Sequence, residues 1–183
     1  MLKEFGFLNI KIKKKIENVT VESKSIMLVG DGMVKVGRFF EDFKEGEEFE
    51  SPARTVTEAD IVNFAGISGD FNPLHVDEEF AKKTKFGRRI AHGVLTFAIM
   101  TGLWGRTGFL EGTAEAFYGV DRLRFTRPVF IGDTIKVKVK VVSMEDRGET
   151  GLITFHNEVV NQRGEVVMVC DAKILLKKRS TQQ

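Results

Sequence analysis

The segment from Ile90 to Trp104 constrains the fold most, because its side chains are apolar on almost every side of a helix. A few polar residues interrupt it, and it is shorter than the roughly 18 apolar residues that a membrane-spanning helix needs. A helix of this kind outside a membrane must be buried on most sides. The rest of the chain therefore has to wrap around it.

The second half of the chain supplies the wrapping. Four segments are rich in valine, isoleucine, threonine and phenylalanine, namely residues 116–125, 134–144, 152–161 and 166–176. Turn sequences at residues 145–148 and 161–164 separate the last three segments at hairpin distance, which predicts an antiparallel sheet. A first strand is expected over residues 50–56, followed by a short helix from the capping Thr57 to Gly66. One sheet curled around one long helix is an α+β domain of hot-dog type.

The domain is expected to cover residues 37–179. The chain has 183 residues, 42% of them hydrophobic, which suits a single domain with one core. Residues 1–36 are expected to be an N-terminal extension of unclear role, and residues 180–183 a tail. Acidic residues and the lack of arginine in the extension argue against an organellar leader without excluding one.

Composition excludes several classes of function. The net charge of +2 lacks the basic footprint of a nucleic-acid-binding protein, and no apolar run is long enough to cross a membrane. The single cysteine and three scattered histidines give neither a disulfide framework nor the ligand spacing of a metal site. A cytoplasmic location is therefore expected.

Several side chains are assigned by pattern alone. Alternation over residues 136–140 places a row of lysines on the open face of the sheet, as a solvated surface. Cys170 is expected to be a small buried residue, and His156 a surface or structural one. Further core residues are expected at Phe97, Met100, Phe109 and Phe117.

The loop Ser68-Gly69-Asp70-Phe71-Asn72-Pro73-Leu74-His75 holds a close pair of an acid and a histidine. Asn72 precedes proline and is pushed out of the helical region, so the chain bends and the side chains of Asp70 and His75 can converge. A carboxylate and an imidazole that face one water can remove one proton and deliver another. The alternative is structural: Asp70 forms an Asx turn and His75 caps the next segment.

This loop, followed by Phe86-Gly87 and by Ile90-Ala91-His92-Gly93-Val94-Leu95, resembles the signature of the MaoC-like, (R)-specific enoyl-CoA hydratase family. The similarity runs from about Gly46 to the last strand. It implies a hot-dog fold, a catalytic dyad of Asp70 and His75, and a supporting role for Asn72. The implied reaction is the reversible hydration of a trans-2-enoyl-CoA to a (3R)-3-hydroxyacyl-CoA in fatty acid metabolism, by a homodimer or larger homo-oligomer without metal or other cofactor.

The resemblance also suggests roles along the buried helix. Gly93 lies near its start, where backbone N–H groups are unpaired, and would donate to the thioester oxygen; the alternative is a packing glycine. The hydroxyl of Thr101 either reaches the site or bonds back to a helix carbonyl. Trp104 either belongs to the core or limits the depth of an acyl pocket. His92 is taken as a supporting residue.

Three other functions are compatible with the same fold. A dehydratase of acyl-carrier-protein (acyl-ACP) thioesters would use the basic face of residues 136–140 to meet an acidic carrier. A thioesterase would carry its acid on or near the central helix, and there is none between Ile90 and Trp104. A non-catalytic acyl-CoA-binding subunit would not need Asp70 and His75.

Overall fold

The computed structural model describes residues 26–29, 32–35 and 37–179. Within the predicted extension it shows a hairpin of two antiparallel strands, β1 (Ile26–Val29) and β2 (Gly32–Lys35). The rest of the extension and the 180–183 tail lie outside the described residues.

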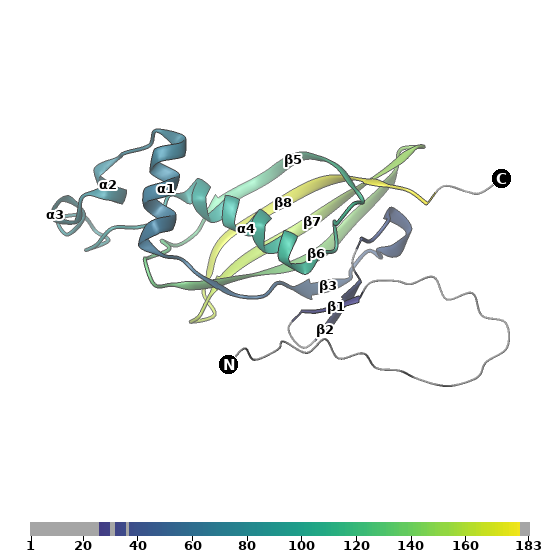
Figure 1. Cartoon of the computed structure of the whole chain (residues 1–183), viewed down its shortest axis with the longest axis horizontal. Helices are drawn as coiled ribbons and strands as arrows, with labels where there is room; N and C mark the ends of the chain where they lie inside the picture. The colour runs from purple at the N-terminus through teal and green to yellow at the C-terminus, as the bar shows by residue number, and fades with distance from the viewer. Residues whose placement is uncertain (1–25, 30–31, 36, 180–183) are drawn as a thin grey trace, which may run out of the picture.

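One six-stranded antiparallel sheet forms the body of the domain (Figure 1). The strand order is β3-β6-β7-β8-β5, and β4 pairs with β6 beside β3. Their bounds are β3 (Glu48–Glu50), β4 (Arg54–Thr55), β5 (Ala114–Phe125), β6 (Thr134–Asp146), β7 (Thr150–Asn161) and β8 (Val166–Lys177). The predicted α+β hot-dog architecture is confirmed, with four long strands close to the predicted positions.

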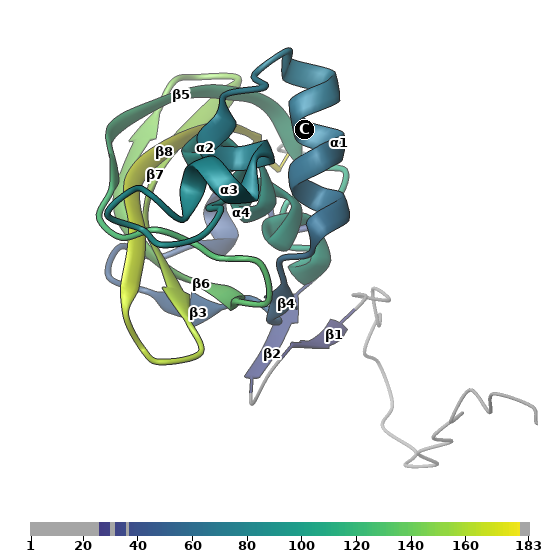
Figure 2. The ribbon, with the colours of Figure 1, turned by 90° about the vertical axis from the view of Figure 1, so that its left-hand side faces the viewer.

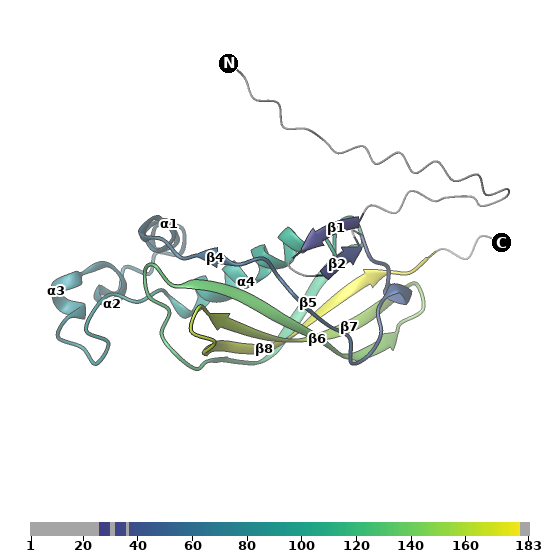
Figure 3. The ribbon, with the colours of Figure 1, turned by 90° about the horizontal axis from the view of Figure 1, so that it is seen from below.

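The helix α4 (Gly93–Thr107) lies within the curve of this sheet (Figure 2), and in the described part of the chain no helix covers the sheet's other face (Figure 3). Its buried residues include Leu95, Ile99, Met100 and Leu103. They pack on the inward side chains of the strands, such as Val137, while the lysines of β6 point outward as predicted. Among the described residues no helix has both the length and the apolar character to cross a bilayer.

The predicted start of this helix at Ile90 is wrong by three residues. Ile90 forms an isolated bridge with Phe130, and the Ala91 N–H donates to the carbonyl of Val129 at 2.8 Å. These bonds hold the chain extended until His92. The helix ends at Thr107, and the following Gly108, with φ of 70°, breaks the helical path.

Three further helices gather at one end of the sheet: α1 (Glu58–Ser68), α2 (Pro73–Val76) and α3 (Glu78–Ala81) (Figure 1). Thr57 and Asp60 form a capping box at the start of α1. The predicted end at Gly66 is wrong, because the residue that adopts the left-handed conformation is Gly69, with φ of 75°.

The predicted strand over residues 50–56 is broken into β3 and β4. Pro52 has no N–H to donate to the ladder. Ser51 bridges the gap: its N–H donates to the Val137 carbonyl at 2.9 Å, and its hydroxyl accepts from the Val137 N–H at 3.0 Å. A short 3₁₀ turn, η1 (Phe40–Asp42), precedes β3.

The core centres on four aromatic rings packed edge to face, with centroids 5.5 to 6.1 Å apart: Phe43, Trp104, Phe109 and Phe155. Met100, Phe109 and Cys170 are buried as predicted, and Phe97 packs against this core. The prediction for Phe117 is wrong. It lies on the edge strand β5 and is 46% exposed.

Candidate active site

The turn between α1 and α2 is built by short side chains that bond to nearby backbone. After Gly69, the N–H of Asp70 donates to the Ser68 hydroxyl at 3.2 Å. The Asn72 N–H donates to the Asp70 carboxylate at 3.2 Å, and the Asn72 side chain accepts from the Leu74 N–H at 3.0 Å. Asn72 therefore caps α2, and its N–H bonds the Asp70 carboxylate.

The turn brings Asp70 and His75 together. A carboxylate oxygen of Asp70 and a ring nitrogen of His75 lie within 4.8 Å of each other. Nδ1 of His75 is 2.8 Å from the carbonyl oxygen of Ile90. A carbonyl only accepts, so Nδ1 carries the hydrogen and Nε2 of the neutral ring holds a free lone pair. The structure thus offers an exposed carboxylate beside a partly exposed imidazole that is set up as a base.

A second imidazole, His92, lies directly behind this pair. It is 2% exposed, and its ring stacks on that of His75 with centroids 3.8 Å apart and planes inclined by 31°. Its Nε2 is 3.0 Å from the backbone oxygen of Asp70. Burial lowers the pKa of His92 below its ordinary value, the bond to Asp70 opposes this, and His75 adds to the lowering. His92 is therefore neutral at neutral pH.

Among the described residues, Asp70, His75 and His92 are also the group whose ligand atoms lie close enough together for a metal ion. Imidazole lone pairs lie in the plane of the ring, and a metal binds at about 2.0–2.1 Å from the nitrogen. Two rings stacked 3.8 Å apart at 31° do not direct their lone pairs to one such point. Each ring also has one nitrogen bonded to a carbonyl. The geometry fits acid–base chemistry better than metal binding.

Gly93 is the first residue of α4, immediately after His92. The first N–H groups of a helix have no partner within it and carry partial positive charge. Gly93 also has a packing role, because a Cβ here would lie 2.8 Å from the ring of Phe125. The two interpretations of Gly93, as a backbone N–H donor and as a packing glycine, are therefore compatible.

Comparison with known proteins decides the family. The MaoC like domain model matches residues 42–163, which contain the whole of this site. The chain belongs to the MaoC-like domain family. The resemblance inferred from the two motifs is confirmed.

The relatives of this MaoC-like protein include enzymes. It is 38% identical over 141 residues to the (R)-specific enoyl-CoA hydratase of Rhodospirillum rubrum, covering 77% of this chain and 93% of that one. The X-ray structure of the monoamine oxidase regulatory protein from Archaeoglobus fulgius has a TM-score of 0.73 at 43% identity, with 78% and 95% of the two chains covered. A conserved hypothetical protein from Mycobacterium tuberculosis with a double hotdog fold, at 21% identity and TM-score 0.70, supports the fold alone; 80% of this chain and 46% of that one are covered.

Two other predicted residues of this MaoC-like protein lie further along α4. The Thr101 hydroxyl donates to the Ala98 carbonyl at 2.8 Å, which is the backbonding alternative. Trp104 is 2% exposed, and its Nε1–H donates to Asn157 Oδ1 at 3.1 Å. The structure does not bring Thr101 or Trp104 into contact with Asp70 or His75.

Arg89 was not predicted from the sequence, yet it ties the helices around the site together. Its guanidinium bonds both oxygens of Glu58 at 2.7 Å and reaches Glu78 at 3.2 Å. These partners sit at the starts of α1 and α3. No local sequence pattern predicts this ion pair, because Glu58 lies 31 residues away from Arg89 along the chain.

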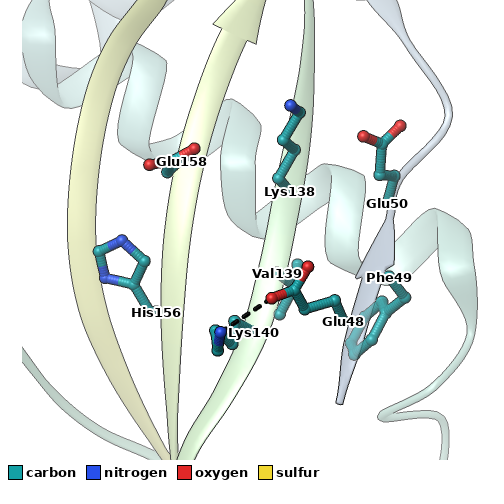
Figure 4. Close-up of a pocket in the computed structure, with 8 residues that line it drawn as sticks. All are labelled: Glu48, Phe49, Glu50, Lys138, Val139, Lys140, His156 and Glu158. Atoms are coloured by element: carbon teal, nitrogen blue, oxygen red, sulfur yellow. Dashed lines mark ion pairs between the residues drawn. The ribbon is translucent and has the colours of Figure 1, made fainter. Parts of the chain in front are cut away.

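A separate hollow of about 490 Å³ lies on the sheet face opposite α4 (Figure 4). Its lining includes Lys138, Lys140, Glu48, His156 and Glu158, and none of the residues of the candidate site. Lys140 pairs with Glu48 at 2.9 Å (dashed in Figure 4). The lysines of this face are thus interleaved with acids, as expected for a solvated surface.

Proposed function

We propose that this MaoC-like protein catalyses the reversible hydration of a trans-2-enoyl-CoA to a (3R)-3-hydroxyacyl-CoA. The observation that carries the proposal is the pairing of Asp70 with a His75 whose Nδ1 is engaged and whose Nε2 is free. The hydratase named in Rhodospirillum rubrum supports the choice of reaction. The stereochemistry is taken from that relative.

In the proposed reaction, Nε2 of His75 takes a proton from water as the oxygen bonds to C3 of the enoyl group. Negative charge then develops on the thioester oxygen, where the N–H at the start of α4, that of Gly93, stabilises it. The dyad returns a proton to C2, so the net change is the addition of one water. No oxidation state changes in the protein, and the chemistry needs only a general acid and a general base.

Coenzyme A is the carrier we propose to test first. The argument for an acyl carrier protein rests on the lysines of β6, and two of these are already engaged: Lys136 with Glu50 and Lys140 with Glu48. Neutralised lysines attract an acidic protein less strongly than a free basic row would.

We also propose that the protein acts as a homodimer joined along β5. This strand is at the edge of the sheet, and its side chains Phe117, Tyr118 and Phe125 are 46%, 55% and 45% exposed. An edge strand that exposes aromatic side chains is a ready template for pairing with a second copy. Sedimentation analysis of the parent should give a dimer, and Tyr118→Asp should shift it toward monomer; a monomeric parent would contradict this part of the proposal.

The function is tested by following enoyl absorbance with crotonyl-CoA. Asp70→Asn and His75→Ala should each lower kcat by at least about 100-fold, the usual contribution of a general acid or base. Asp77→Asn is the matched control, because Asp77 is an exposed acid that caps α3 through Phe80 N–H, a bond that asparagine retains. It should leave kcat within about twofold.

The alternatives give different results in the same experiment. Release of free thiol from acyl-CoA would indicate a thioesterase. Activity with the crotonyl carrier-protein thioester alone would change the carrier, while acyl-CoA binding without turnover would indicate a binding subunit. Each of these outcomes rejects the hydration of enoyl-CoA.

A further inference from the structure

His92 and His75 cross-link two segments of the chain in a reciprocal way. His75, from α2, bonds through Nδ1 to the carbonyl of Ile90, two residues before His92. His92, at the start of α4, bonds through Nε2 to the carbonyl of Asp70, in the turn that leads to His75. The two imidazole rings also stack on each other, with their centroids 3.8 Å apart.

Of the two ring nitrogens of His92, only Nε2 has a hydrogen-bond partner among the described residues. The Asp70 carbonyl only accepts, so Nε2 carries the hydrogen, and Nδ1 of the neutral ring is left as an acceptor. Nδ1 is buried and has no hydrogen-bond partner among the described residues. An unsatisfied buried acceptor is destabilising, so a phenyl ring would fill the same space without this cost. What the imidazole adds over a phenyl ring is the bond to Asp70.

We propose that His92 is a positioning residue for the dyad, which orients the Asp70 turn through Nε2–H and the His75 ring through its face. At 2% exposure it has almost no surface with which to meet a substrate, so it acts through its two neighbours. Phe64 of α1 packs on the same ring, with centroids 5.0 Å apart. The titratable groups that face His92 are Asp70 and His75. This inference rests on the proposed function for its kinetic test.

Two substitutions separate the two contacts. His92→Phe keeps a ring for His75 to stack on and removes the donor to Asp70. His92→Gln places an amide N–H near the position of Nε2 and removes the stacked ring. Each should lower kcat about 10- to 100-fold with little change in KM, since misplacing a reacting group by about 1 Å can cost as much.

The matched control is His156→Gln. His156 also bonds through Nδ1, to Asp171 at 2.7 Å, but on the outer face of the sheet. It should keep kcat within about twofold. If His92→Phe, folded by circular dichroism, also keeps kcat within about threefold, the proposal is wrong.

A variant cycle in which the two dyad residues are changed together distinguishes positioning from a general effect on folding. In a chain already carrying His75→Ala and Asp70→Asn, adding His92→Phe should lower the residual kcat by less than about twofold, because a positioning residue has nothing left to position. An equal loss in both backgrounds would indicate a merely structural role.

Histidine-ring NMR tests the inference without activity. The chain has three histidines, so each ring is assigned by substitution. In the parent, His75 should be protonated on Nδ1 and His92 on Nε2. In His92→Gln the stacked ring that holds His75 against the Ile90 carbonyl is gone, so the His75 ring should leave that carbonyl and average between tautomers. An unchanged His75 spectrum in both variants would overturn the proposal. A parent that is inactive on every thioester but shows these tautomers would reject the proposed function alone.

Discussion

The bond between Trp104 and Asn157 makes a measurable prediction about the core. Asn157 is 0% exposed, its Oδ1 accepts from the indole Nε1–H at 3.1 Å, and its Nδ2 donates to the Phe155 carbonyl at 2.7 Å. Trp104→Phe keeps an aromatic ring beside Phe109 and Phe155 but removes the donor. Asn157 Oδ1 is then buried without that partner.

The expected loss has two parts. Leaving a buried acceptor unsatisfied costs about 1–3 kcal/mol. The smaller ring leaves roughly 40 Å³ empty, worth about 1 kcal/mol at roughly 24 cal/mol per Å³. The free energy of unfolding should therefore fall by about 2–4 kcal/mol, and Tm by roughly 5–15 °C for a chain of this size.

Urea unfolding followed by circular dichroism measures this loss, because Trp104 is the only tryptophan and its fluorescence disappears in the variant. Trp104→Phe combined with Asn157→Leu replaces both polar partners by apolar groups. The double variant should be more stable than the sum of the single effects predicts, by about 1–3 kcal/mol. Simple additivity, or a single-variant loss below about 1 kcal/mol, would refute the reasoning. A shift of the substrate preference toward longer acyl chains would instead place Trp104 in the wall of an acyl pocket.

Three further predictions follow from local contacts. Gly93→Ala should lower the free energy of unfolding by about 1 kcal/mol, because the new Cβ would lie 2.8 Å from the Phe125 ring. Adding Phe125→Leu should relieve this loss. Equal Tm values for Gly93→Ala and the parent would contradict the prediction. Burial alone would raise the pKa of Asp133, but hydrogen bonds, that from Arg163 foremost, lower it below its ordinary value. The ionised Asp133 carboxylate therefore stabilises the fold above about pH 4, and this contribution is lost as pH falls through the pKa of the folded state. In acid-unfolding curves, the difference in stability between the parent and Asp133→Asn should shrink as pH falls below about 4. Burial raises the pKa of Cys170 to about 11, so iodoacetamide should label it only after denaturation, and labelling of the native protein would contradict its burial.

The sheet and its central helix were predictable because periodicity depends on many residues at once. Val137 and Val139 alternate with lysines along β6, and no single exception changes that pattern. The predicted element boundaries are wrong where a single backbone hydrogen bond, or its loss, determines the local conformation. Pro52 interrupts a strand, and the Ala91 N–H holds the chain extended where apolar periodicity indicates a helix.

Phe117 shows a different limit of sequence reasoning. An apolar residue on an edge strand has the same local pattern as one in the core, because the pattern records alternation and not the strand's place in the sheet. Only the strand order, with β5 at the edge, reveals the difference.

The sequence resemblance already assigned His75 to the dyad and His92 to a supporting role, and the geometry supplies the physical reason for the difference. In both, one ring nitrogen donates to a backbone carbonyl, which fixes the tautomer and leaves the other nitrogen without a hydrogen. In His75 the bare nitrogen is Nε2, on a partly exposed ring beside the Asp70 carboxylate, where it can take a proton from water. In His92 it is Nδ1, which is buried, where a proton would bring unsolvated charge against the neighbouring imidazole. Burial, and not residue type, therefore determines which imidazole can serve as the base.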